Sequence, residues 1–204
     1  RNAGLDVLGV PTLQEIISKK GMEYVAIGVG TSGNAYVHNP LADLYGGATI
    51  HPEFTIPSSL HKELKGLFGG WPEEQLPNTP RYKKAADIFI DYVLGKINPE
   101  VALIWSSEPD KSQHAFGVGS DAAKAALREA DLEFGRVMEY IRDSSQHQNS
   151  DLMILSDHGY STISEVINIE TLLESSNLAG SGGWLLAQNG GCALFYLKNQ
   201  KLFC

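Results

Sequence analysis

Short apolar runs bounded by turn residues recur along the chain. Tyr24–Val29, Val101–Trp105, Leu152–Leu155 and Cys192–Leu197 are each almost continuous in apolar side chains. Runs of this kind are typical of strands that a parallel sheet buries on both faces. We therefore predict four strands, the last of them close to the C-terminus.

Segments with helical periodicity lie between these runs. Thr12 and Glu15 have the spacing of a capping box, and the helix that they begin ends at Gly21. Another helix is predicted from Thr79-Pro80 to Gly95, and a short one over Ile169–Ser175. The longest runs from about Asp121 to Asp143, with its apolar stripe at Ala123, Leu127, Ala130, Phe134, Val137 and Ile141. This order of elements predicts an α/β fold, with a mostly parallel sheet flanked by helices.

The segment from Asn34 to Thr79 has no clear periodicity, and prolines and glycines punctuate it. A segment of this length without regular structure is usually a functional lid or an insertion, so we predict an irregular loop or lid over residues 34–79. Before it, Gly28–Gly33 is rich in glycine but lacks the spacing of a phosphate-binding loop. We expect no helix directly after it and interpret it as the exit of a strand into a loop.

Acid and imidazole side chains follow two of the predicted strands. Asp110 and His114 come soon after Val101–Trp105, and Asp157 and His158 come directly after Leu152–Leu155. If both strands are parallel in one sheet, both pairs lie at the same edge, where parallel α/β sheets bind their ligands. Carboxylate and imidazole ligands without thiolates suit zinc, manganese or iron. The alternative is that all four are ordinary turn residues.

The composition narrows the possible partners. The chain has 204 residues, 43% of them hydrophobic, and a formal net charge of -8. Surfaces that bind nucleic acids are basic, whereas this chain is acidic, so no nucleic-acid polymer is expected as a partner. Bound divalent cations can still attract an anionic substrate. No apolar run reaches the length of a membrane span, and no signal peptide is visible. Because the sequence opens with Arg1, we expect its beginning to be missing, which leaves the compartment open.

The remaining histidines and the cysteine in the last strand receive structural interpretations. His38, His51 and His61 are interpreted as packing or surface residues, because none has a carboxylate at ligand spacing. His147 is expected to be solvated in a polar stretch, and Cys192 to be a buried thiol.

Two motifs resemble those of a known family. Residues 108–117 read EPDKSQHAFG and resemble the EPDxxGHxxG motif of type I phosphodiesterases and nucleotide pyrophosphatases, which belong to the alkaline phosphatase superfamily. Residues 156–160 read SDHGY and are similar to the SDHGM motif of that family. Pro11 to Gly33 resembles the helix and strand that follow the family's nucleophile. The resemblance implies an alkaline-phosphatase-like fold, incomplete here, with residues 1–204 as the central part of one catalytic domain.

The resemblance also implies a site and an activity. Asp110 and His114 would bind one divalent metal ion, and Asp157 and His158 the other, with zinc as the expected metal. The intact protein would be a metal-dependent hydrolase of phosphodiester or pyrophosphate bonds in small, nucleotide-type substrates. Two metal ions support in-line displacement at phosphorus by a hydroxyl nucleophile. The family resemblance favours a periplasmic or extracellular location.

This chain departs from the family pattern in several places. Gln113 stands where many members have glycine, and Tyr160 stands where Met is usual. The family's Thr or Ser nucleophile, its early metal-binding Asp and its last metal-binding His have no counterpart in this sequence. Thr12 is rejected as nucleophile because its capping box explains it. We therefore expect no catalytic residue in this chain, an inactive fragment, and metal sites that are weakly occupied or empty.

Other functions stay open at this point. The resemblance also admits a phosphomonoesterase, a phosphonate hydrolase or a phosphoglycerate mutase of the same superfamily. A non-catalytic domain that keeps the fold is a further alternative.

Overall fold

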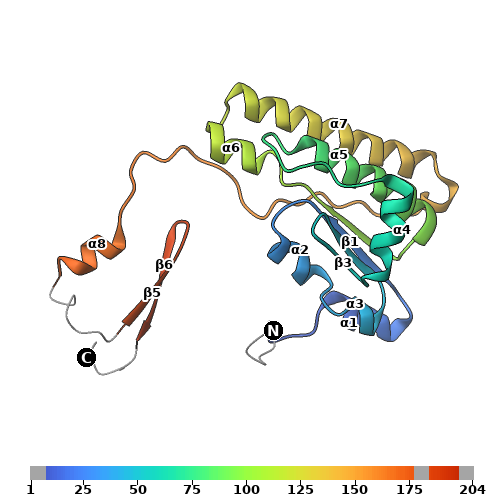
Figure 1. The fold of residues 1–204 in the computed structure, drawn as a ribbon, viewed down its shortest axis with the longest axis horizontal. Coiled ribbons are helices and arrows are strands. Elements are labelled where there is room, and N and C mark those ends of the chain that lie inside the picture. Colours follow the sequence, from blue (N-terminus) through green and yellow to red (C-terminus); the bar gives the residue numbers. More distant parts are fainter. Residues whose placement is uncertain (1–7, 177–183, 198–204) are drawn as a thin grey trace. The chain divides into compact units, whose positions relative to one another are not determined.

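The computed structural model describes residues 8–176 and 184–197 of the chain. Its contacts divide the chain into two compact units, Arg1–Tyr160 and Ser161–Cys204 (Figure 1). The first unit contains the sheet, the hydrophobic core and all four predicted metal ligands. That the whole chain is the central part of one catalytic domain stays a prediction.

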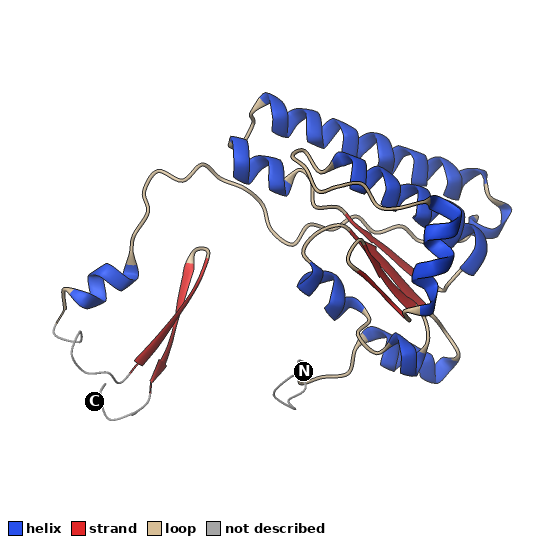
Figure 2. Cartoon of the chain, in the orientation of Figure 1, coloured by secondary structure: helices blue, strands red, loops and turns tan. Residues whose placement is uncertain are grey.

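A four-stranded mixed sheet forms the centre of the first unit (Figure 2). Its order is β3-β2-β1-β4, with β1 parallel to both of its neighbours and β3 antiparallel to β2. In this register Ala26 pairs with Thr49 on one side and with Leu103 on the other. The strands are β1 (Tyr24–Gly28), β2 (Ala48–His51), β3 (Phe54–Ile56) and β4 (Val101–Trp105).

Helices cover both faces of this sheet (Figure 1). In chain order they are α1 (Leu13–Ile17), the 3-10 turn η1 (Ser18–Lys20), α2 (Ser32–His38), α3 (Ala42–Tyr45), α4 (Ser59–Phe68), α5 (Thr79–Ile88), the π-helix η2 (Phe89–Ile97), α6 (Asp110–Phe116), α7 (Asp121–Asp143) and the 3-10 turn η3 (Ser145–His147). The unit is therefore α/β, consistent with an alkaline-phosphatase-like fold.

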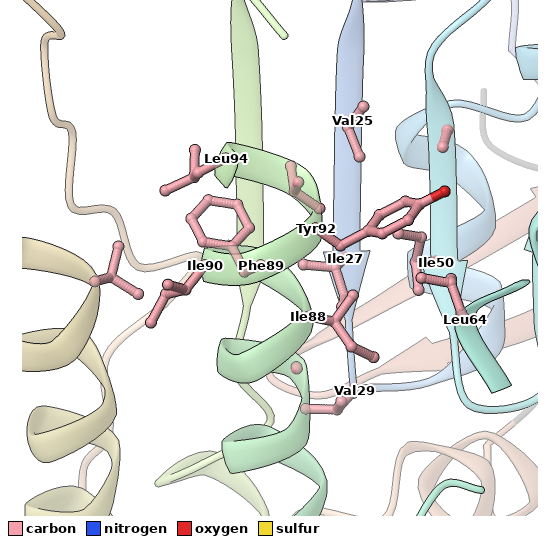
Figure 3. Packing of buried hydrophobic residues seen from close by; sticks show 14 of the residues in the cluster. Val25, Ile27, Val29, Ile50, Leu64, Ile88, Phe89, Ile90, Tyr92 and Leu94 are labelled. Carbon is pink, nitrogen blue, oxygen red and sulfur yellow. The ribbon is translucent and has the colours of Figure 1, made fainter. Parts of the chain in front are cut away.

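Alternating side chains of β1 explain the two helical layers. Val25, Ile27 and Val29 are fully buried in the hydrophobic cluster with α5, η2 and α7. Figure 3 shows Ile88 directed toward Ile27 and Val29. The other face of β1 carries Gly28, where an added Cβ atom would lie 3.9 Å from that of Ala35 in α2. Gly28 therefore lets α2 lie close to the carboxyl end of the strand.

Several sequence predictions are confirmed. Strands occupy Tyr24–Gly28 and Val101–Trp105, and a helix spans Asp121–Asp143. Thr12 caps α1 in a reciprocal capping box with Glu15, and Gly21 ends the turn that follows at φ 71°. The helical elements among them were predictable because periodicity and caps depend on chemistry within a few neighbouring residues.

The prediction for residues 34–79 is wrong in its main part. This segment contains α3, α4 and two strands of the sheet, and only 69–78 remains irregular between α4 and α5. The reading of Gly28–Gly33 is also wrong, because α2 begins at Ser32 with the Thr31 hydroxyl as its N-cap. Prolines and glycines here separate many short elements, which hides their periodicity. A lid role for this segment stays a prediction.

The predicted strand Leu152–Leu155 does not form. These residues are irregular, and Met153, Ile154 and Leu155 are 78%, 73% and 80% exposed. A strand needs a neighbour for its N–H and C=O groups, and an apolar run does not specify that neighbour. Among the described residues, β4 pairs only with β1.

The described residues of the second unit form one helix and a hairpin. Helix α8 (Ile169–Glu174) confirms the short helix, and β6 (Cys192–Leu197) confirms the last strand. It pairs antiparallel with β5 (Trp184–Asn189). Cys192 is exposed rather than buried, because β6 pairs only with β5 and no described residue of this unit is buried.

His147 also differs from its prediction. It was expected to be solvated, but it is only 7% exposed. The turn η3 places its ring 5.8 Å from that of Tyr140 in α7. A polar sequence around His147 did not reveal this contact, since the ring packs on a helix that precedes it in the chain.

Candidate metal centre

A buried carboxylate fixes the loop between β4 and α6. Glu108 is 4% exposed. Its Oε1 atom accepts a hydrogen bond from the backbone N–H of Asn78 at 2.7 Å, and its Oε2 atom accepts one from the N–H of Ser112 at 3.1 Å. The two bonds satisfy the buried charge and tie the first turn of α6 to the start of α5.

Asn78 extends this network to the end of β1. Its Nδ2 atom donates to the carbonyl oxygen of Val29 at 3.3 Å and contacts the hydroxyl oxygen of Ser107 at 3.0 Å. The carboxyl ends of β1 and β4 and the first turns of α5 and α6 are thus joined by buried polar groups. These bonds tie the start of α6 to α5 and β1 at this edge of the sheet, although Oδ1 of Asn78 and Oγ of Ser112 have no hydrogen-bond partner among the described residues.

Asp110 and His114 lie one turn apart on α6. The Oδ1 atom of Asp110 lies 3.6 Å from Nε2 of His114, and the side chains are 44% and 69% exposed. Helical spacing of four residues places both on one face of the helix. The pair is therefore open to solvent and to a ligand.

Asp157 and His158 reach the same place from a segment without regular structure. The Nε2 atom of His158 lies 3.6 Å from Oδ1 of Asp110 and 3.7 Å from Oδ2 of Asp157. The structure thus brings the two predicted pairs together, with Asp110 between the two imidazoles. It does so although the strand expected before Asp157 is absent.

Tyr160 lies at the middle of this group. Its hydroxyl donates to Oδ1 of Asp110, and it lies 3.2 Å from the Asp110 carbonyl oxygen. Its ring meets the rings of His114 and His158 edge-on, with centroids 5.2 Å and 5.4 Å away. Partial burial, together with the bond to Asp110, raises the pKa of the Tyr160 phenol. The phenol therefore stays a hydrogen-bond donor.

The donor set offers the oxygen and nitrogen ligands that zinc accepts. Ligand atoms about 2.0–2.1 Å from a tetrahedral zinc ion lie roughly 3.3 Å apart. The separations of 3.6 Å between Asp110 and each imidazole are close to that value. In the part of the chain that the structure describes, however, no three Asp, Glu, His or Cys side chains converge well enough to hold an ion together. The group consists of overlapping ligand pairs.

The two departures from the family motifs have different structural meanings. Gln113 lies inside α6, and it is absent from the described non-glycine residues with positive φ. A glycine is therefore not needed at this position for backbone reasons. Tyr160, by contrast, adds a hydroxyl and a ring to the group. Sequence reasoning noted Tyr160 only as a departure from the motif and missed both Tyr160 and Glu108 as parts of the site. The only available signal was their position inside the two motifs.

An open hollow borders His114. It is lined by Glu74, Gln75, Leu76, Lys111, His114 and Ala115. An ion pair between Lys111 and Glu74 joins its two walls, the irregular stretch before α5 and helix α6. The hollow offers apolar, amide and charged groups beside the candidate centre.

Comparison with known proteins relates the chain to phosphodiesterases. The sequence model of the type I phosphodiesterase / nucleotide pyrophosphatase family matches residues 16–203. The venom phosphodiesterase of Macrovipera lebetinus is 35% identical over 66 residues, which are 32% of this chain and 8% of that protein. The venom phosphodiesterase of Naja atra is 33% identical over 66 residues, again 32% of this chain and 8% of that protein.

A fungal protein is similar over a longer stretch. An uncharacterized pyrophosphatase/phosphodiesterase of Schizosaccharomyces pombe is 26% identical over 93 residues, which are 45% of this chain and 19% of that protein. The matched stretches thus span less than a fifth of the length of these relatives. No solved structure matches this chain. Of the helices in residues 8–176 and 184–197, none has the length and apolar character that a bilayer span requires.

Proposed function

Because the chain belongs to the type I phosphodiesterase / nucleotide pyrophosphatase family, we propose that it is part of a metal-dependent hydrolase of phosphodiester or pyrophosphate bonds. Its substrates are small phosphate esters of nucleotide type. Asp110 and His114 bind one divalent ion, and Asp157 and His158 bind a second. The proposed metal is zinc, since the four side chains offer oxygen and nitrogen donors and no thiolate.

The position of Asp110 carries this proposal. One of its carboxylate oxygens lies 3.6 Å from an imidazole nitrogen of His114 and equally far from one of His158. Two residues from α6 thus lie beside two from a segment more than forty positions later, as overlapping pairs within 4 Å. Unrelated turn residues have no reason to meet in this way, so the arrangement favours a common ligand.

The surroundings of the site support an anionic substrate. Divalent ions, when bound, supply positive charge that stabilises the oxygens of an in-line displacement at phosphorus. The chain's own residues hold those ions and shape the space beside them. The hollow at His114 lies next to the proposed ligands and has room for the part of the substrate that leaves. Lys111 places an ammonium group in its wall, where it is paired with Glu74.

The chain by itself is proposed to bind metal without turning over substrate. Thr12, the one hydroxyl considered as a nucleophile, accepts a hydrogen bond from the N–H of Glu15 at 3.2 Å as the N-cap of α1. Its role in the capping box leaves no reason to assign it to catalysis. The hydrolytic activity is therefore proposed for the whole protein.

Zinc titration of the chain tests the ligand assignment. Asp110→Asn and Asp157→Asn should each weaken zinc binding at least about tenfold, because each removes a negatively charged ligand. Asp121→Asn is the matched control, since this exposed carboxylate at the start of α7 lies outside the group. Equal zinc affinity in wild type and all three variants would make the four side chains ordinary turn residues.

A substrate panel on the whole protein tests the reaction. A chromogenic phosphodiester should be hydrolysed faster than the corresponding monoester, and Asp110→Asn should lower that rate. Faster hydrolysis of the monoester would point instead to a phosphomonoesterase of the same superfamily. Metal-dependent diester hydrolysis by residues 1–204 alone would contradict the proposed inactivity of the isolated chain.

A further inference from the structure

We propose that Tyr160 is a positioning residue that holds the two ligand pairs together. It stands where the family motif usually has Met, so its hydroxyl and aromatic ring are particular to chains with this substitution. The inference rests on the proposed function in treating the four side chains as metal ligands. The contacts of Tyr160 are independent of that assignment.

The hydroxyl of Tyr160 orients the carboxylate of Asp110. It donates to Oδ1, the same oxygen that faces both imidazoles, and the Asp110 carbonyl oxygen lies 3.2 Å away as a second acceptor. A methionine side chain has no hydrogen to donate. A hydrogen bond to a ligating carboxylate fixes its orientation and commonly changes metal affinity by 10–100-fold.

The ring of Tyr160 limits the rotation of both histidines. The plane of the His114 ring is inclined by 76° to that of Tyr160, and the plane of His158 by 61°. These are edge-to-face arrangements, the favoured geometry for neighbouring rings. One side chain therefore restricts two proposed ligands that come from different segments.

Tyr160 also compensates for missing regular structure. Residues 151–159 form no helix or strand and are exposed, so no backbone ladder places Asp157 and His158. Within the described residues, the polar contacts from 157–160 to α6 end on Asp110, and Tyr160 makes the hydrogen bonds among them. The tie between this segment and α6 therefore depends on Tyr160.

Measuring the zinc affinity of the full chain separates the contribution of the Tyr160 hydroxyl from that of its ring. Tyr160→Phe should weaken zinc binding about tenfold in competition with a chromophoric chelator, with the urea midpoint of unfolding unchanged. In wild type, zinc should produce an ultraviolet difference spectrum of tyrosine, and this signal should be missing from the zinc-saturated variant. Tyr45→Phe is the control, because Tyr45 lies on α3 outside the group, and it should keep both the affinity and the signal.

Proton NMR of the metal-free chain tests the ring contacts without zinc. The ring protons of His114 and His158 should shift in Tyr160→Leu and stay near their wild-type positions in Tyr160→Phe, because only the former removes the ring current. Unchanged imidazole signals in Tyr160→Leu, or full zinc affinity in Tyr160→Phe, would overturn the positioning role. If wild type bound no zinc while the imidazole shifts followed this pattern, the proposed function would fail and the positioning contacts would stand.

Discussion

Asp110 is the residue on which the candidate centre depends. Among the described residues, Asp110 is the only proposed ligand with a carboxylate oxygen within 4 Å of two imidazole nitrogens. It also accepts a hydrogen bond from the Tyr160 hydroxyl. The backbone beneath it is fixed by Glu108, whose carboxylate bonds to the first turn of α6. Tyr160 thus holds the side chain of Asp110 and Glu108 holds its backbone, so both have little room to move.

At the same scale, Thr12 offers a test of the capping box. Thr12→Ala should lower the free energy of unfolding by about 1 kcal/mol, because the N–H of Glu15 loses its acceptor at the start of α1. Ser58→Ala is the matched control. Ser58 occupies the N-cap position of α4 without a capping hydrogen bond, so its loss should change stability very little. Urea unfolding measures this free energy for both variants. Equal decreases in the two variants would show that the hydrogen bond of Thr12 contributes nothing specific.

The site was predictable from sequence only in part, for a reason visible in these residues. Asp110, His114, Asp157 and His158 could be selected because acid and imidazole groups follow apolar runs. Tyr160 could not, because its partner Asp110 is 50 positions away. Glu108 was hidden for the same reason, since its bond to Asn78 spans 30 positions. Contacts of this separation depend on the fold and leave no local pattern.

At the scale of elements, local chemistry explains which predictions succeeded. Helix α7 carries a long apolar stripe and the Ser120 N-cap, and both signals lie within the helix or beside it. The run Leu152–Leu155 consists of apolar residues alone but forms no strand. A helix satisfies its backbone groups internally, whereas a strand relies on a partner. The sequence of a short apolar run does not specify which strand will pair with it.

Two glycines test how closely the elements pack. Gly47 precedes β2 at φ 70°, and an added Cβ atom would lie 2.1 Å from the Tyr24 carbonyl oxygen. Gly47→Ala should therefore destabilise the chain by at least about 2 kcal/mol. Gly66→Ala is the matched change inside α4, where nothing lies within 4 Å, and it should stabilise by about 0.5–1 kcal/mol. Thermal unfolding of the two variants measures both changes in stability. A Gly47→Ala variant as stable as wild type would contradict the close approach of β1 to Gly47.

At the scale of the whole molecule, the buried core lies in one unit. Every residue of the hydrophobic cluster belongs to Arg1–Tyr160. The described residues of Ser161–Cys204 include none that is buried. Burial of apolar area is the main source of folding stability. We therefore expect the first unit to provide most of the stability of this chain.

Limited proteolysis checks this division. Residues 151–159 and 161–168 are exposed and irregular, so their backbone can enter a protease without local unfolding. A broad-specificity protease at low concentration should cut first between 151 and 168 and leave a resistant product that ends after α7 and η3. Mass spectrometry identifies the product. Early cuts within β1, α5 or α7 would show that the first unit is not the stable part.

The central claim is that four side chains from two segments hold zinc through oxygen and nitrogen. The most direct measurement is the X-ray absorption spectrum of the zinc-loaded chain. It should show imidazole nitrogen and carboxylate oxygen at about 2.0–2.1 Å from the metal and no sulfur. A shell of sulfur at about 2.3 Å, or a spectrum without imidazole scattering, would contradict the assignment to Asp110, His114, Asp157 and His158.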